Sequence, residues 1–213
     1  MTTDDRRTFL ELNDSDGRKL KIPIEFVARQ KVGVKTDLLA KALGRRKSGR
    51  RILVVDATAG LCRDSMHLLA LGCEVIAIER NAKLFKAFSE LKAPENFQLV
   101  HGDAVEWLRN IDDVTDGLPS SHRMPDIVFL DPMFPEKAKS AAVSKETRAL
   151  QLLEKPPTEA EESALLTAAR AAALDRVIVK RPRLAPYLAG QKPSHEYEGK
   201  AVRYDVYVVK KNR

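Results

Sequence analysis

The chain has 213 residues, of which 44% are hydrophobic and 31% charged, a balance that excludes an intrinsically disordered protein and suits one large domain with or without a small appendage. Lysine and arginine exceed aspartate and glutamate by 37 − 30 = 7 residues. Such a surplus is typical of proteins that bind nucleic acid, although basic proteins with other partners are common.

The cysteines and histidines argue against a metal centre. Cys62 and Cys73 do not have the spacing of metal ligands, so we expect free, buried thiols in a reducing compartment. The four histidines are scattered along the chain. The segment after Met1 is polar, and no apolar stretch reaches the length of a bilayer span. We therefore expect a soluble, cytoplasmic protein with no metal ion and no membrane partner.

Residues 1–50 differ in kind from the rest and predict a small appendage. The turn signal Asn13-Asp-Ser-Asp-Gly17 lies between two segments of alternating or clustered apolar residues, which indicates a β-hairpin. The predicted elements are strands at 8–12 and 19–24 and a helix at 36–43 that Gly44 ends. A basic run at 45–51 follows, and a solvated linker and an RNA contact both remain open for it.

Residues 51–213 form the predicted main domain, in which strands alternate with helices. This rhythm implies right-handed βαβ crossovers and a parallel sheet. A weak strand at 195–198 and a firm one at 202–209 have no helix between them, so we expect a closing antiparallel hairpin. The fold class is therefore a Rossmann-like α/β domain with a seven-stranded, mostly parallel sheet. The other predicted strands are 52–55, 74–78, 97–100, 126–130 and 176–179, and the helices are 63–71, 82–91, a short one through Trp107, and 158–174 with a capping box of Thr158 and Glu161.

An acidic residue falls at the end of each of the first four strands of this domain. These residues are Asp56, Glu79, Asp103 and Asp131, at intervals of 79 − 56 = 23, 103 − 79 = 24 and 131 − 103 = 28 residues, each close to one βα unit. The carboxyl ends of parallel strands meet at one edge of the sheet, which is where open α/β sheets bind ligands. Because crowded carboxylates repel each other, we expect a polar, positively charged ligand there.

The loop Asp56-Ala-Thr-Ala-Gly-Leu-Cys-Arg-Asp64 predicts what that ligand is. Its small residues, Gly60 among them, let a ligand approach the backbone at the start of a helix. The loop is neither Gly-x-Gly-x-x-Gly nor a P-loop, which disfavours a nicotinamide-dependent oxidoreductase and a triphosphate site. Glu79 is placed to accept from ribose hydroxyls and Asp103 from an adenine amino group, while Arg80 stacks, pairs or faces solvent. S-adenosylmethionine fits this pattern.

The stretch Asp126-Ile-Val-Phe-Leu-Asp-Pro-Met-Phe-Pro135 predicts the chemistry. A buried strand ends at Asp131, Pro132 fixes the following backbone, and Phe134 offers a flat apolar surface. One carboxylate, one fixed carbonyl and one aromatic ring suit the exocyclic amine of a flat base. We therefore interpret Asp131, Pro132 and Phe134 as catalytic residues, although most strings of this kind are ordinary turns.

Four blocks of the sequence resemble the RsmJ-type family. That family comprises class I methyltransferases that use S-adenosylmethionine to methylate the N2 amine of a guanine in 16S ribosomal RNA. The likeness implies a class I methyltransferase fold and a partner that is ribosomal RNA or the small ribosomal subunit. The first fifty residues depart from the family's pattern. The blocks are Val55-Asp-Ala-Thr-Ala-Gly-Leu-Cys-Arg-Asp64, Ile78-Glu-Arg-Asn81, Phe129-Leu-Asp-Pro-Met-Phe-Pro-Glu-Lys-Ala-Lys-Ser140 and Val179-Lys-Arg-Pro182.

The resemblance also assigns site residues. It implies cofactor contacts at Arg63, Asp64, Glu79, Arg80, Asp103, Ala104 and Asp131, to which the loop after the first strand adds Asp56 and Gly60. Basic residues flank the catalytic edge and are candidate phosphate contacts, with a solvated surface charge as the alternative for each. These are Lys137, Lys139, Lys180, Arg181 and Arg183.

Two other functions stay open from the sequence alone. The same carboxylate, carbonyl and ring can serve adenine N6 or an amino group of DNA. A basic ribosome-assembly factor can keep this fold and bind RNA without catalysis.

Overall fold

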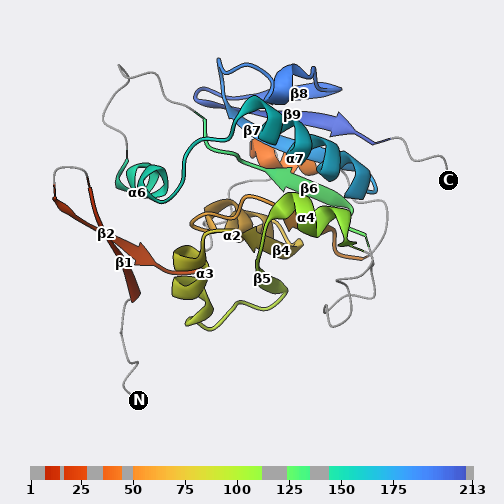
Figure 1. Ribbon diagram of the computed structural model, residues 1–213. Coiled ribbons are helices and arrows are strands. Elements are labelled where there is room, and N and C mark those ends of the chain that lie inside the picture. Colours follow the sequence, from red (N-terminus) through yellow and green to blue (C-terminus); the bar gives the residue numbers. More distant parts are fainter. Residues whose placement is uncertain are drawn as a thin grey trace.

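The computed structural model describes residues 8–14, 17–27, 36–44, 50–111, 124–134 and 144–209 (Figure 1). Within these ranges the centre is a seven-stranded sheet made of β3 (Leu53–Asp56), β4 (Glu74–Glu79), β5 (Phe97–His101), β6 (Ile127–Leu130), β7 (Arg176–Pro182), β8 (His195–Glu198) and β9 (Val202–Val208). The strand order is β5-β4-β3-β6-β7-β9-β8. Pairs among β3 to β7 are parallel, whereas β9 pairs antiparallel with β7 and β8. The predicted sheet and its closing hairpin are confirmed.

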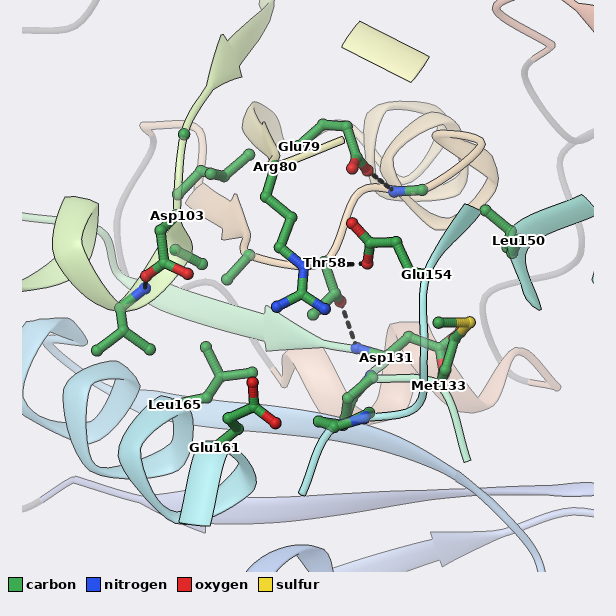
Figure 2. Close-up of a pocket in the computed structure, with 18 of the residues that line it drawn as sticks. Thr58, Glu79, Arg80, Asp103, Asp131, Met133, Leu150, Glu154, Glu161 and Leu165 are labelled. Carbon is green, nitrogen blue, oxygen red and sulfur yellow. Dashed lines mark hydrogen bonds and ion pairs between the residues drawn. The ribbon is translucent and has the colours of Figure 1, made fainter. Parts of the chain in front are cut away.

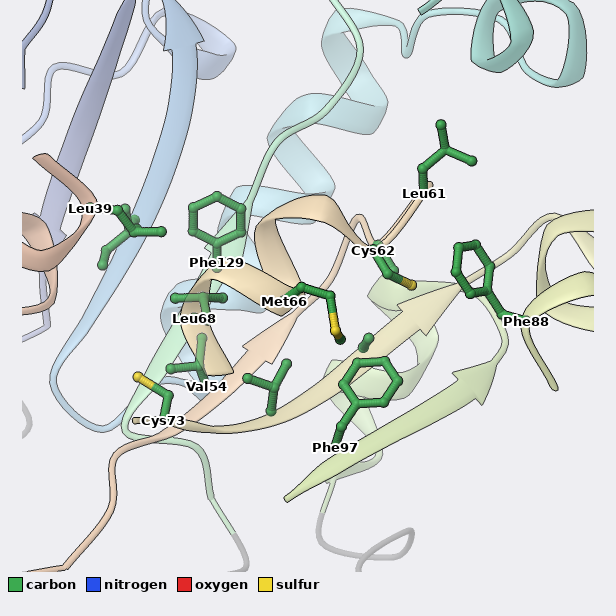
Figure 3. Packing of buried hydrophobic residues seen from close by; sticks show 14 of the residues in the cluster. Leu39, Val54, Leu61, Cys62, Met66, Leu68, Cys73, Phe88, Phe97 and Phe129 are labelled. Atoms are coloured by element: carbon green, nitrogen blue, oxygen red, sulfur yellow. The ribbon is translucent and has the colours of Figure 1, made fainter. Parts of the chain in front are cut away.

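Helices cover both faces of the sheet because its strands are apolar on both sides. Side chains of successive strand residues point to opposite faces, so Val54 and Phe129 join one core while Val55 and Val128 join the other. The first core, drawn in Figure 3, contains residues of α1 (Leu38–Leu43), α2 (Arg63–Ala70) and α3 (Ala82–Ser89). The second contains residues of α4 (Ala104–Arg109) and α7 (Glu159–Ala172). The sheet is therefore the middle layer of three.

Side-chain caps begin most of the helices in the described ranges. Asp37, Asn81 and Asp103 each accept backbone N–H groups at the start of a helix, and Thr158 forms the predicted capping box with Glu161. Two helices of the described ranges were not predicted: α6 (Lys145–Leu153) and the short 3-10 helix η1 (Leu188–Gly190). In the part of the chain that is described, no helix combines the length and apolarity that crossing a bilayer requires.

The N-terminal hairpin is also confirmed. It pairs β1 (Thr8–Asn13) with β2 (Lys19–Ile24) in a separate two-stranded sheet beside α3 (Figure 1). Leu10, Ile22 and Ile24 are buried in the same core as α1, α2 and α3. The Nη2 atom of Arg148 on α6 lies 2.8 Å from Oδ2 of Asp14, just after β1. The division at residue 50 stays a prediction, since this core is shared across it.

Both cysteines are free and buried, as expected. Cys62 has a left-handed backbone with φ 55° at the start of α2, and burial raises the pKa of its thiol. Cys62 therefore belongs to the core and is held as a neutral thiol.

Candidate active site

A cavity opens at the carboxyl ends of β3, β4 and β6, where the strand order reverses direction (Figure 2). It encloses about 1000 Å³ of empty space, counting its open mouth. The residues after the strands form one wall, and the segment from α6 into α7 forms the other. Of the predicted site residues, it is lined by Gly60, Glu79, Arg80, Asp103, Ala104, Asp131 and Pro132.

Glu79 is fixed at the end of β4 by two backbone donors. The N–H of Gly60 donates to its Oε2 and the N–H of Asn81 to its Oε1, both at 2.7 Å. Gly60 has φ 51°, a left-handed conformation that glycine adopts without a steric cost. Burial raises the pKa of Glu79 to about 7 in spite of these donors. The carboxylate is thus fixed in position, and a ligand that donates hydrogen bonds to it would favour its charged form.

Asp103 and Ala104 begin α4 at the same edge. Oδ1 of Asp103 accepts from the N–H groups of Val105 and Glu106 at 2.9 and 3.0 Å. Asp103 is therefore both a helix cap and part of the cavity wall.

Asp131 is held from two sides at the end of β6. Its N–H donates to Oγ1 of Thr58 at 2.6 Å, and Nζ of Lys180 donates to its Oδ2 at 2.8 Å. The same Nζ donates to Oδ2 of Asp64 at 2.6 Å. Burial raises the pKa of Asp131 to about 6, while Lys180 opposes this shift and Asp64 adds to it. Burial alone would lower the pKa of Lys180, but the two carboxylates together raise it.

Phe134 lies against a buried arginine. The guanidinium carbon of Arg181 lies 4.9 Å from the centre of the Phe134 ring, within the range of a cation–π contact. Arg181 is only 2% exposed, and its Nη1 donates to Oε1 of Glu162 at 3.1 Å. One face of the aromatic ring is thus backed by a fixed, charge-compensated side chain.

Asp56 and Arg63, both predicted to contact the cofactor, do not line the cavity. Asp56 is 1% exposed behind the cavity wall, where it accepts from Ser65 and from the N–H of Thr58, and burial raises its pKa to about 7. Arg63 pairs with Glu146 of α6 at 2.7 Å. These contacts make Asp56 a support of the loop and direct the Arg63 guanidinium to α6.

The basic residues named as phosphate contacts remain a prediction, and those among the described residues already pair with carboxylates. Lys180 and Arg181 are engaged with carboxylates inside the protein, and Arg183 pairs with Glu198 at the surface. Lys137 and Lys139 lie outside the described residues.

The sequence interpretation missed the second wall of the cavity. Leu150 and Glu154 come from α6 and its end, and Glu161 and Leu165 come from α7. A signal for α6 was present, since Ser144 precedes a run of good helix formers and caps it. The role of Thr58 had no such signal, because its partner Asp131 is 73 residues away in the chain.

The cavity is acidic in a protein that is basic overall. Among the residues that the structure describes, five carboxylates line it, from Glu79, Asp103, Asp131, Glu154 and Glu161, against one arginine, Arg80. Arg80 donates to Glu154 at 3.0 Å. Burial raises the pKa values of both Glu79 and Asp131, so their charged forms are disfavoured by removal from water. A cationic ligand with hydrogen-bond donors fits this wall.

Comparisons with known proteins agree with this arrangement. A solved structure of a SAM-dependent methyltransferase from Neisseria gonorrhoeae has a TM-score of 0.67 and 31% identity, and the match covers 98% of this chain and 86% of that one. An rRNA methyltransferase from Streptomyces viridochromogenes, at 13% identity and a TM-score of 0.51, shares the fold. The sheet and its cavity thus have the architecture of a class I methyltransferase.

The sequence comparisons narrow this class. A family model described as "Putative SAM-dependent methyltransferase" matches residues 4–209. Ribosomal RNA small subunit methyltransferase J from Pseudoalteromonas atlantica is 43% identical over 189 residues, which cover 83% of this chain and 70% of that protein. The protein of the same name from Aeromonas hydrophila is 41% identical over 219 residues, covering 94% and 83%. The chain belongs to this S-adenosylmethionine-dependent family, that of ribosomal RNA small subunit methyltransferase J.

Proposed function

We propose that this chain transfers a methyl group from S-adenosylmethionine to the exocyclic N2 amine of a guanine in 16S ribosomal RNA. The observation that carries the proposal is Asp131, which stands at the cavity edge and is anchored by Thr58 and Lys180. The names of the relatives support ribosomal RNA of the small subunit as the substrate. Guanine N2 rests on the resemblance of the sequence blocks to the RsmJ-type family. The proposal includes a cytoplasmic location, because ribosomal subunits are assembled there.

The acidic cavity is proposed to hold the cofactor, which supplies an electrophilic methyl group on a positively charged sulfur. The two oxygens of Glu79 keep lone pairs beyond those used by Gly60 and Asn81, and these accept from ribose hydroxyls. Asp103 accepts from the adenine amine, and Arg80 and Ala104 complete the wall. Asp64 acts through Lys180, to which it is paired.

Asp131 and Pro132 are proposed to orient the target amine. The lone pair of an exocyclic amine is delocalised into the purine ring, so the amine is a weak nucleophile. Lys180 occupies Oδ2 of Asp131, which leaves Oδ1 to accept one N–H while the carbonyl oxygen of Pro132 accepts the other. The nitrogen can then pyramidalise and direct its lone pair into the cavity. As the new carbon–nitrogen bond forms, the bond from the methyl group to sulfur would break and a neutral thioether would be left. The carboxylate of Asp131 stabilises the positive charge that develops on the nitrogen and accepts the surplus amine proton at Oδ1, from which it passes to solvent.

Phe134 is proposed to stack on the guanine with the ring face that Arg181 does not cover. The buried guanidinium stiffens this platform, because it fixes the ring from behind. Stacking of a base on an aromatic ring contributes roughly 1–3 kcal/mol. Substrate position, and therefore most of the rate gain, depends on these fixed groups.

The test is single-turnover transfer of labelled methyl to 16S ribosomal RNA and to small subunits, followed by nucleoside analysis. Asp131→Asn should lower the rate on the order of 10²–10³-fold, since it removes a preorganised charge. Asp175→Asn, at the opposite edge of the sheet where Asp175 pairs with Arg176, is the matched control and should behave as the unmodified chain.

The product decides between the candidate functions. N2-methylguanosine is expected, whereas N6-methyladenosine would keep the mechanism and overturn the substrate. If the chain binds RNA but transfers no methyl group, the result would favour the alternative that it is a non-catalytic ribosome-assembly factor. A rate for Asp131→Asn equal to that of the unmodified chain would refute the assigned role of Asp131.

A further inference from the structure

The turn after β7 holds one leucine almost completely in water. Leu184 is 91% exposed, while the other exposed large apolar side chains among the described residues reach at most 41%. The N–H of Ala185 donates to the carbonyl of Pro182 at 3.0 Å, which closes a four-residue turn with Leu184 at its third position. Single exposed leucines are common on protein surfaces, so the surroundings of the turn decide whether this one matters.

The surroundings show that the turn is rigidly held. Arg203, 7% exposed, donates to the carbonyl oxygens of Arg183 and Ala185 at 2.9 and 3.2 Å. Arg181 donates to the carbonyl oxygen of Pro186 at 3.3 Å. Two buried guanidinium groups thus bind three backbone carbonyls that flank the leucine, those of Arg183, Ala185 and Pro186. These bonds hold the backbone of the turn in the conformation that presents Leu184 to solvent.

The turn also lies at the catalytic edge. β6 and β7 run parallel with Leu130 opposite Val179, so Asp131 and Lys180 follow at the same level and contact each other. One residue further, Arg181 contacts the Phe134 ring with its guanidinium carbon and the turn with its Nε. The same side chain therefore backs the proposed base platform and supports the turn that carries Leu184.

We propose that Leu184 is an apolar wedge that enters the base stack of the RNA at the place the target guanine leaves. The inference rests on the proposed function, because it concerns the same RNA substrate. A guanine within a helix has to be unstacked before its amine can reach Asp131. Apolar side chains such as leucine serve this purpose in other nucleic-acid complexes by inserting between base steps. An exposed leucine in the turn that Arg181 supports, the same side chain that backs Phe134, supplies that group.

The experiment compares Leu184→Ala with the unmodified chain on folded and on unstacked RNA. Folded substrates are small subunits, and unstacked substrates are short single-stranded fragments of 16S ribosomal RNA. The control is Leu174→Ala, which removes a 40% exposed leucine just before β7, at the opposite edge. Thermal unfolding and S-adenosylmethionine affinity should be unchanged in both variants.

We expect Leu184→Ala to lower single-turnover transfer to small subunits about tenfold or more, equivalent to about 1.4 kcal/mol of activation free energy, and to leave transfer to the fragments unchanged. Leu184→Met should restore the rate, since it keeps the apolar reach. An equal loss on both substrates, or no loss on either, overturns the wedge while the unmodified chain still supports the proposed function. If the unmodified chain methylates neither substrate, the proposed function fails, and the wedge fails with it.

Discussion

Replacing Lys180 with methionine is expected to slow methyl transfer near neutral pH without abolishing it. Asp131 must be ionised to accept from the amine, so the rate rises with pH through its pKa. Burial raises that pKa to about 6, and Lys180 acts against the rise. With a pKa of 6, about 90% of Asp131 is ionised at pH 7, since the ratio of the two forms is ten to one.

The magnitude follows from the contact between Nζ and Oδ2. A charge-assisted hydrogen bond contributes about 1.5–3 kcal/mol, and one pKa unit corresponds to about 1.36 kcal/mol. Losing the bond should raise the pKa of Asp131 by about one to two units. The ionised fraction at pH 7 then falls to between about 50% and 10%, which gives a rate loss of about two- to tenfold. Above pH 9 the loss should nearly disappear.

The assay is a pH–rate profile from single-turnover transfer to small subunits at saturating S-adenosylmethionine, so that cofactor affinity does not enter. Asp64→Asn provides a test of opposite sign, because Asp64 raises the pKa of Asp131. Its acid limb should move to lower pH while that of Lys180→Met moves to higher pH. Coinciding acid limbs for Lys180→Met and the unmodified chain would refute the electrostatic reasoning, even if both variants were slow.

Two further predictions concern the cofactor and the fold. Burial raises the pKa of Glu79 to about 7, so S-adenosylmethionine affinity measured by titration calorimetry should fall as the pH drops from 8 to 6. Glu79→Gln should bind more weakly at pH 8 and show a shallower profile over this range, in which the titration of Asp131 remains; a variant as pH-dependent as the unmodified chain would exclude Glu79 as the titrating group. Thr158→Ala removes the capping box of α7 and should cost about 0.5–2 kcal/mol, seen as a Tm lower by about 2–4 °C per kcal/mol. An unchanged Tm would mean that the cap contributes nothing measurable.

The elements that the sequence predicted are those whose signals are local. A short apolar run closed by Asp-Pro indicates strand β6, and the capping pair of Thr158 and Glu161 indicates the start of α7. Carboxylates after successive parallel strands predicted the edge where Glu79, Asp103 and Asp131 meet, because parallel strands end together. These inferences needed periodicity and connectivity alone.

What the sequence did not reveal depends on which side chains meet across long separations. Lys180 and Arg181 are neighbours in a basic run, yet one pairs with Asp131 and Asp64 and the other with Glu162. Their charge alone suggested that both contact phosphates, because a sequence does not show whether a basic side chain is paired with a carboxylate of the same protein. The distinction comes from register, which puts Lys180 level with the end of β6.

Helix α6 gives the cofactor cavity and the N-terminal hairpin a common wall. Leu150 and Glu154 face the cavity, while Arg148 of the same helix reaches Asp14 after β1. A displacement of α6 when a cofactor enters or leaves would therefore also change the contact between Arg148 and Asp14 at the hairpin. A shortened chain that begins at Arg51 would lose this support and would uncover the core that Leu10, Ile22 and Ile24 close. The hairpin and the catalytic edge thus share one supporting helix.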